Sequence, residues 1–288
     1  MPKSYSLYLG CYIPTVQPFA ELALRKIAPI LGIELLDIKG TTCCPVPEIV
    51  RLSDEDTWLN VAVRNLSLAE SMGKDIMVLC NGCWDTLTEA GEVLHEEPDL
   101  KVKINSHLSS FGKEFTGKVE VKHFVEVLVE DVGLDNLKKA IRRSLTELNV
   151  AIQYGCKFYK SENEKFIAYF DDIVRALGVK IVDYGVERVC CGYPLTLHSF
   201  DMAVEEKSKW KLDKLKEAKV DCVVLVCPAC YDQLEKAQFM LRRKGVRYDI
   251  PLLHLTELIA LALGFTPIEE IALDRHRIRC DPVMKKLG

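Results

Sequence analysis

Residues 75–83 read Asp-Ile-Met-Val-Leu-Cys-Asn-Gly-Cys, and residues 222–230 read Cys-Val-Val-Leu-Val-Cys-Pro-Ala-Cys. In each stretch a short apolar run, rich in branched side chains, stops at a Cys-x-x-Cys pair. Such runs are typical of buried β-strands. We therefore expect each strand to present two thiols at its carboxyl end.

The other cysteines fall at matching places ahead of these two stretches. The spacing is C-x31-CC-x35-C-x2-C in the first half and C-x33-CC-x35-C-x2-C in the second. A five-cysteine pattern that recurs in this way indicates an internal duplication. The first set is Cys11, Cys43, Cys44, Cys80 and Cys83, and the second is Cys156, Cys190, Cys191, Cys227 and Cys230. Cys222, inside a strand run, is assigned to core packing, and Cys280 is given no role.

Further apolar runs and helical patterns repeat along both halves. The expected strands are 7–11, 33–38, 75–80 and 119–123, then 151–156, 179–184, 222–227 and 248–254. The expected helices are 19–31, 57–72 and 84–94, then 164–177, 201–216 and 231–241, with a further helix at 131–149 before the second half. Alternating strands and helices predict right-handed βαβ units. We expect an α/β fold of two homologous halves, 1–147 and 148–288, each a small, mainly parallel sheet with flanking helices, related by pseudo-two-fold symmetry.

In this fold every cysteine group follows a strand, at the sheet edge where open α/β sheets bind ligands. The five thiols of each half should therefore converge on one site. His123 and His254 end the fourth strand of each half, and each is followed by x-x-Glu. Because imidazole titrates near neutral pH, both are candidate catalytic proton donors. The alternative is a structural histidine near a helix start.

The cysteine pattern favours an iron–sulfur cluster over zinc. Structural zinc takes four ligands in a tetrahedron, whereas each half offers five thiols, two of them adjacent. Neighbouring cysteines chelate one small ion poorly, but a wider cluster can take both. Zinc, and plain buried or redox-switch cysteines, stay as alternatives. No ferredoxin run, G-x-G-x-x-G or P-loop motif is present, so electrons should come from another protein.

Charge and hydropathy exclude several classes of partner. The chain has 38 basic and 42 acidic residues, a net charge of −4 and no long basic block, so we expect no nucleic acid partner. No apolar run approaches the roughly 18 to 20 residues that span a bilayer, so no membrane insertion is expected. Without a secretory signal, twelve cysteines fit a reducing, cytoplasmic location better than a disulfide framework.

The duplicated pattern resembles the cysteine-rich CCG domain, and the whole chain is similar to the B subunits of heterodisulfide reductases from methanogenic archaea. The resemblance rests on Cys190-Cys191-Gly192 and on the segments 122–133 and 254–264. It implies that each set of five cysteines holds a non-cubane 4Fe-4S cluster. It also implies that the disulfide of coenzyme M and coenzyme B is reduced to two thiols between the clusters, each supplying one electron.

The same resemblance implies a multisubunit complex. Its partners would be a ferredoxin-type iron–sulfur subunit, a flavin subunit, and a hydrogenase or formate dehydrogenase. The chain departs from the family pattern at Pro45, where the motif has glycine, and at Lys157, where we expect histidine. Lys157 either helps to hold an anionic substrate or is simply a solvated lysine.

Two other functions remain open from the sequence. One is a related CCG-domain oxidoreductase subunit that acts on another disulfide, on lactate or glycolate, or on a quinone. The other is a non-catalytic subunit, either an electron-transfer protein or a metal-stabilised scaffold.

Overall fold

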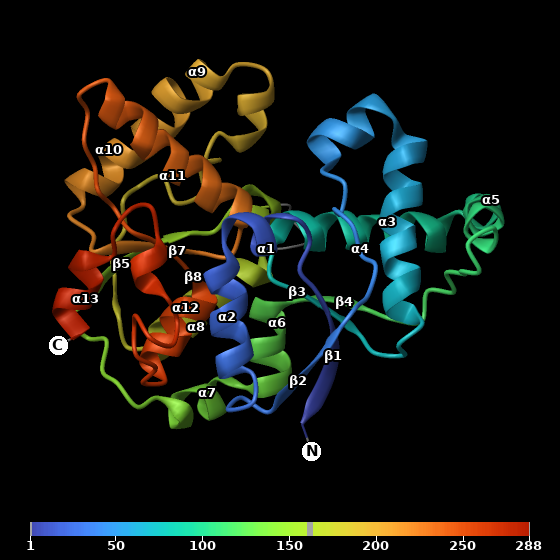
Figure 1. The fold of residues 1–288 in the computed structure, drawn as a ribbon, viewed down its shortest axis with the longest axis horizontal. Coiled ribbons are helices and arrows are strands. Elements are labelled where there is room, and N and C mark those ends of the chain that lie inside the picture. Colours follow the sequence, from blue (N-terminus) through green and yellow to red (C-terminus); the bar gives the residue numbers. More distant parts are fainter. Residues whose placement is uncertain (1, 160–163, 288) are drawn as a thin grey trace.

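The computed structural model describes residues 2–159 and 164–287. Within these residues, each half of the chain builds one four-stranded sheet with helices around it (Figure 1). The first sheet has the order β2-β1-β3-β4 and the second β6-β5-β7-β8. The strands are β1 (Lys3–Tyr8), β2 (Ile33–Asp37), β3 (Ile76–Val78), β4 (Val121–His123), β5 (Asn149–Gln153), β6 (Lys180–Ile181), β7 (Cys222–Leu225) and β8 (Leu252–His254).

Helices connect the strands. They are α1 (Tyr12–Val16), α2 (Pro18–Ile27), α3 (Glu55–Glu70), α4 (Asn81–Glu96), α5 (Pro98–Ser109), α6 (Phe124–Glu126), α7 (Leu134–Ala140), α8 (Lys165–Ala176), α9 (Phe200–Met202), α10 (Lys209–Glu217), α11 (Pro228–Arg243), α12 (Leu255–Ala262) and α13 (Asp281–Leu287). Short 3₁₀ or π-helical turns lie at Pro47–Arg51, Val127–Val132, Cys156–Tyr159, Tyr193–Leu197, Ala203–Ser208 and Leu273–Arg275. No described helix combines the length and the apolar character needed to cross a bilayer.

All strand pairs in the two sheets are parallel, and both sheets repeat the same order. Parallel neighbours need crossover connections, which the helices supply. This confirms the predicted α/β fold with two homologous halves. The boundary that we propose at 147/148 lies between α7 and β5.

The predicted helix at 131–149 is wrong over much of its length. Helix α7 covers only Leu134–Ala140, and Ile141 is already extended, with ψ 132°. The backbone N–H groups of Arg142 and Arg143 donate to the carbonyl oxygen of Ala262 at 2.8 and 2.9 Å. The connection is therefore held against the end of α12, and these tertiary hydrogen bonds replace those of a continued helix.

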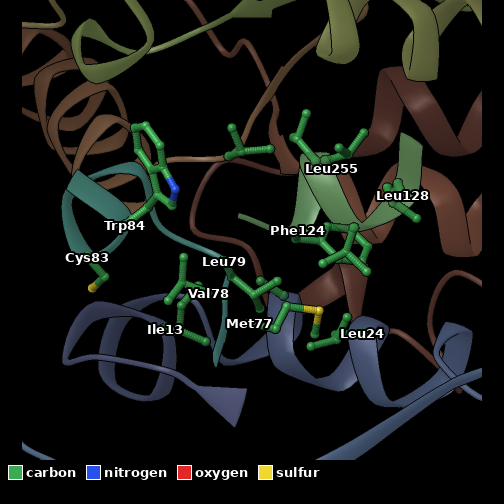
Figure 2. Packing of buried hydrophobic residues seen from close by; sticks show 14 of the residues in the cluster. Ile13, Leu24, Met77, Val78, Leu79, Cys83, Trp84, Phe124, Leu128 and Leu255 are labelled. Atoms are coloured by element: carbon green, nitrogen blue, oxygen red, sulfur yellow. The ribbon is translucent and has the colours of Figure 1, made fainter. Parts of the chain in front are cut away.

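The larger of the two apolar clusters is shared by the two halves, whereas the buried residues of the smaller one all belong to the second half. Helix α12 of the second half packs against α2 of the first (Figure 1), where the Thr256 hydroxyl donates to the Ala20 carbonyl at 2.9 Å. Figure 2 shows part of the cluster, with Leu24 and Met77 of the first half and Leu255 of the second. Cys222 is fully buried in this cluster, which confirms its assignment to core packing.

Candidate functional site

The two Cys-x-x-Cys pairs begin two equivalent helices. Cys80 is the N-cap of α4 and Cys227 is the N-cap of α11, both with extended backbone angles. Cys83 and Cys230 follow in the first turn of each helix. Free N–H groups and the positive end of the helix dipole lie at such a terminus, so both pairs stand where a negatively charged group is stabilised.

The loops that carry the adjacent cysteines are held by buried side chains. Asn65 on α3 donates to the Cys43 carbonyl at 3.1 Å and accepts from the Thr42 N–H at 2.9 Å. In the second half, the Ser208 hydroxyl donates to the Cys191 carbonyl at 2.9 Å. Each loop is thus fixed from the helix that follows it, which limits where its thiols can point.

A single cavity brings the cysteines of both halves together. Its lining includes nine of the ten predicted cysteines, Cys11, Cys44, Cys80, Cys83, Cys156, Cys190, Cys191, Cys227 and Cys230. The tenth, Cys43, has its Sγ 3.6 Å from the Sγ of Cys11. Cys80 and Cys227, which occupy equivalent positions in the repeat, interact directly. A contact between equivalent residues is what a two-fold relation between the halves produces.

Hydrogen bonds between thiols favour thiolates at three positions. Cys227 and then Cys83 lower the pKa of Cys80, and Cys43 and then Cys83 lower the pKa of Cys44 to about 6. In the second half, Cys156 and then Cys191 lower the pKa of Cys190 to about 2. Thiol contacts and burial raise the pKa of the other seven cysteines, so metal binding at those positions releases protons, since the thiolate is the metal-binding form.

The arrangement of the thiols suits a wide, multinuclear group. Among the residues that the structure describes, no three His, Cys, Asp or Glu side chains form a site for a single metal ion. The thiols come instead from three loops of each half and contact one another in a row, which joins the two halves at Cys80 and Cys227. A cluster with several irons offers several separate coordination positions, and soft thiolates are its usual ligands. The donor set therefore fits an iron–sulfur cluster better than a tetrahedral zinc ion.

Lys157 is a cavity-lining residue that links the halves. Its ammonium group pairs with Glu48 and, at 2.8 Å, with Asp85, both from the first half. Its side chain is only 15% exposed, so the expectation of a solvated lysine is wrong. Despite the cost of burial, these two carboxylates raise the pKa of Lys157. Lys157 and Glu48 therefore place an ion pair in the cavity lining, and Asp85 supports it from behind that lining.

The two predicted histidines are fully buried, and neither is among the residues that line the cavity. His123 caps α6 by accepting from the Val125 N–H at 3.2 Å, and His254 caps α12 through Thr256 in the same way. Burial, and then the nearby His254, lower the pKa of His123 to about 3. The placement is that of structural histidines at helix starts, and a role in proton transfer stays a prediction.

His254 also reaches across to the first half. Its Nδ1 accepts from the backbone, so its Nε2 carries the proton and donates to the Leu79 carbonyl at 3.1 Å. Glu257 completes a capping box by accepting from the His254 N–H at 2.8 Å. Since Leu79 directly precedes Cys80, this histidine of the second half helps to fix a cysteine loop of the first.

Comparison with known proteins gives the family. The cysteine-rich domain family CCG matches residues 5–88 and again residues 150–235. The chain is 37% identical over 282 residues to the B subunit of the ferredoxin/F420H2-dependent CoB-CoM heterodisulfide reductase of Methanosarcina acetivorans, across 95% of this chain and 93% of that one. The chain belongs to the CCG-domain family of heterodisulfide reductase B subunits. A protein of Archaeoglobus profundus named for its likeness to these B subunits is 38% identical, with 93% of each chain covered.

Two further similarities broaden this picture. The chain is 30% identical to the 8-methylmenaquinol:fumarate reductase membrane anchor subunit of Wolinella succinogenes, across 96% of this chain and 98% of that one. Its fold resembles the crystal structure of a hypothetical protein from Helicobacter pylori, with a TM-score of 0.70 and 14% identity. That match covers 97% of this chain but 52% of the other.

Some residues of the site were not predicted from the sequence. Asn81 donates to the Tyr154 carbonyl of the other half at 2.9 Å, and the hydroxyls of Tyr12 and Tyr193 meet at 2.9 Å across the cavity lining. For Asp85, which pairs with Lys157, the sequence did carry a signal: an aspartate stands two residues after each Cys-x-x-Cys pair, at Asp85 and at Asp232. The two matched CCG segments cover all ten cysteines and neither histidine.

Proposed function

We propose that this chain is an oxidoreductase subunit that reduces the disulfide of coenzyme M and coenzyme B to the two thiols. The observation that carries the proposal is the single cavity lined by cysteines from both halves. Relatives that are 36 to 38% identical over most of the chain are named as B subunits of heterodisulfide reductases or as proteins like them. A shared cavity suits one substrate that must receive electrons from two sides.

We further propose that each set of five cysteines holds one non-cubane 4Fe-4S cluster. The first set would be Cys11, Cys43, Cys44, Cys80 and Cys83, and the second Cys156, Cys190, Cys191, Cys227 and Cys230. When bound, the clusters would supply electrons singly, two in all. Thiolate positions in both halves and two helix N-termini support the assignment, because each stabilises negative charge or binds metal.

The chain's own residues have four tasks in this reaction. Cleaving the S–S bond consumes two electrons and two protons and yields two thiols. The paired loops orient the cysteines, the buried walls exclude water, and Lys157 offers a positive group at the cavity. An anionic substrate group would compete with Glu48 and Asp85 for Lys157. We propose His123 or His254 as the source of a proton.

Electrons must reach the site from a partner protein. The sequence has no ferredoxin, flavin or nucleotide motif of its own. We propose a complex with a ferredoxin-type iron–sulfur subunit, a flavin subunit, and a hydrogenase or formate dehydrogenase. All twelve cysteines are unpaired in the structure, in keeping with a reducing cytoplasmic location.

A second candidate function is suggested by the relative from Wolinella succinogenes. Its 30% identity extends over nearly the full length of both chains. The same cysteine cavity could then pass electrons toward another acceptor, such as a quinone or fumarate, through a partner subunit.

The two functions differ in what reoxidises the reduced protein. We propose to reduce the anaerobically purified chain with dithionite, remove the excess, and add the heterodisulfide, fumarate or a quinone separately. If the chain reduces the heterodisulfide, adding that disulfide should restore the visible absorbance of the oxidised protein. One molecule of each thiol should be released for every two electrons. Full reoxidation by a quinone, with no thiol released from the heterodisulfide, would favour the second function.

A further inference from the structure

Lys211, at the start of α10, is a fully buried lysine in the second half. Its ammonium group donates to the carbonyl of Val186 and to the hydroxyl of Tyr184 at 3.3 Å. The same group lies 5.1 Å from the centre of the Tyr184 ring. Buried charges are rare and costly, and among the described residues no carboxylate is bonded to this ammonium. Its positive charge is thus left to act on whatever lies nearby.

The adjacent-cysteine loop of the second half lies nearby, because Ser208, three residues before Lys211, donates to the Cys191 carbonyl at 2.9 Å. Burial lowers the pKa of Lys211, negative charge on Cys230, Cys191 and the Glu187 carboxylate opposes this, and the net value is about 8. The ammonium form therefore predominates at neutral pH. By the same interaction, the ammonium stabilises negative charge at those cysteines, and low polarity around the pair strengthens the effect.

The equivalent position in the first half carries a cation that is not buried. Arg64 stands twenty residues after Cys44, as Lys211 does after Cys191. It lies partly exposed and donates to the Gly40 carbonyl at 3.1 Å. The duplicated positions thus carry the same sign of charge in both halves, but only that of the second half is buried.

The loops that carry the adjacent cysteines also differ, because only the loop of the second half donates a backbone N–H to one of its own sulfur atoms. Gly192 has φ +100°, and its N–H donates to the Sγ of Cys190 at 3.5 Å. The first half has Pro45 in this place, and proline has no N–H to donate. Asp85 has a counterpart in Asp232, but Glu48, four residues after Cys44, adds a carboxylate to the cavity lining where the second half has Leu195 at the equivalent position.

We propose that Lys211 and the Gly192 N–H make the second-half site the stronger electron acceptor, so that its cluster is reduced before that of the first half. The inference rests on the proposed function, since it requires a cluster in each half. Local charge and hydrogen bonds to sulfur set the potentials of iron–sulfur clusters. A nearby positive charge stabilises the more negative, reduced state. Lys211 does not line the cavity and would act on the cluster only through its charge, so it is a positioning residue and not a catalytic one.

The test is an anaerobic redox titration followed by electron paramagnetic resonance. The wild type should show two reduction steps. Lys211→Met should lower the midpoint potential of the upper step by at least about 59 mV, which is a tenfold change in the equilibrium constant of a one-electron couple. The midpoint potential of the lower step should not change. Lys211→Arg keeps the charge and should keep the upper step. Arg64→Met, at the equivalent position of the first half, should move neither.

A second variant assigns the steps. In Cys43→Ala/Cys44→Ala, the lower step should disappear and the upper step should remain. Should Lys211→Met fold poorly, Lys211→Gln removes the same charge. Full iron content with both steps unmoved, or with only the lower step moved, overturns the inference and leaves the proposed function standing. Absence of iron from the wild type overturns the proposed function and the inference with it.

Discussion

Gly10 and Gly155 stand directly before the first cysteine of each half, and both need glycine for two reasons. Their φ angles are +65° and +85°, a region that other residues rarely adopt. A Cβ at Gly10 would lie 2.7 Å from the Sγ of Cys83, and one at Gly155 would lie 2.7 Å from the Nδ2 of Asn81. The backbone therefore approaches the cysteine loops more closely than any side chain allows.

This geometry yields a prediction with a matched control. Gly10→Ala and Gly73→Ala introduce the same backbone strain, since their φ angles are +65° and +66°, and each should cost about 1–2 kcal/mol of unfolding free energy. A Cβ at Gly73 meets nothing within 4 Å, whereas one at Gly10 displaces Cys83. Iron analysis should show a loss in Gly10→Ala alone. Equal iron in the two variants would contradict this role for Gly10.

The histidines give a second residue-scale prediction. We expect His123→Gln or His254→Gln to slow heterodisulfide turnover by roughly 10²-fold if that residue is the proton donor, with both clusters retained. Both variants should also lose stability of about 1 kcal/mol through the lost helix cap. Turnover and thermal unfolding are measured on the same samples. Wild-type turnover in both folded variants would leave the histidines with their capping role only.

The elements show how far the sequence predicts this fold. The apolar runs that stop at cysteines become β3 and β7. Helices α4 and α11 begin at Asn81 and Pro228, three residues before the starts expected at 84 and 231. The gathering of the thiols follows, because parallel strands bring their carboxyl ends to one edge. Local pattern could not show that Arg142 would bond to Ala262, or that the rings of the two strand-ending histidines would turn to cap helices. Both depend on contacts between segments far apart in the chain.

The C-terminal segment is attached to α12 through a titratable pair. The imidazole of His276 donates to the Glu257 carboxylate at 2.7 Å and stacks on Phe19. Burial alone would lower the pKa of His276, but the Glu257 charge raises it above its ordinary value. A pKa that is raised in the folded protein stabilises the folded state fully at pH values below the pKa of the unfolded chain, about 6.5. This stabilisation is lost as the pH rises through the pKa of the folded protein.

We therefore predict a pH-dependent loss of stability that requires His276. As the pH rises above about 6.5, the unfolding free energy of the wild type should fall more than that of His276→Gln, because the variant has no imidazole at this position to titrate. Denaturant unfolding of both proteins at several pH values gives the comparison. Parallel pH profiles would show that the His276–Glu257 pair does not contribute in this way.

At the scale of the whole molecule, the halves act as one unit. They share a core through α2 and α12, and they share the cavity through the contact of Cys80 with Cys227. A site built across this joint needs both halves in register. The duplication supplies two sets of ligands, and departures from exact repetition, such as Pro45 against Gly192, can make the sets unequal.

The absence of any flavin, nucleotide or ferredoxin motif leads to a prediction about electron supply. The isolated chain should not be reduced at a useful rate by NADH or by hydrogen gas, because nothing in its sequence is suited to accept a hydride. A ferredoxin-type subunit added in stoichiometric amount should restore reduction by its own electron donor. Rapid reduction of the isolated chain by NADH would count against the proposed complex.

Metal analysis of the anaerobically purified chain tests the central claim most directly. Two 4Fe-4S clusters predict about eight irons and as much acid-labile sulfide per chain. Replacing Cys43 and Cys44 by alanine should remove about half of the iron, because only the first set of ligands is broken. One or two zinc ions in place of iron, or full iron retention in the double variant, would contradict the account.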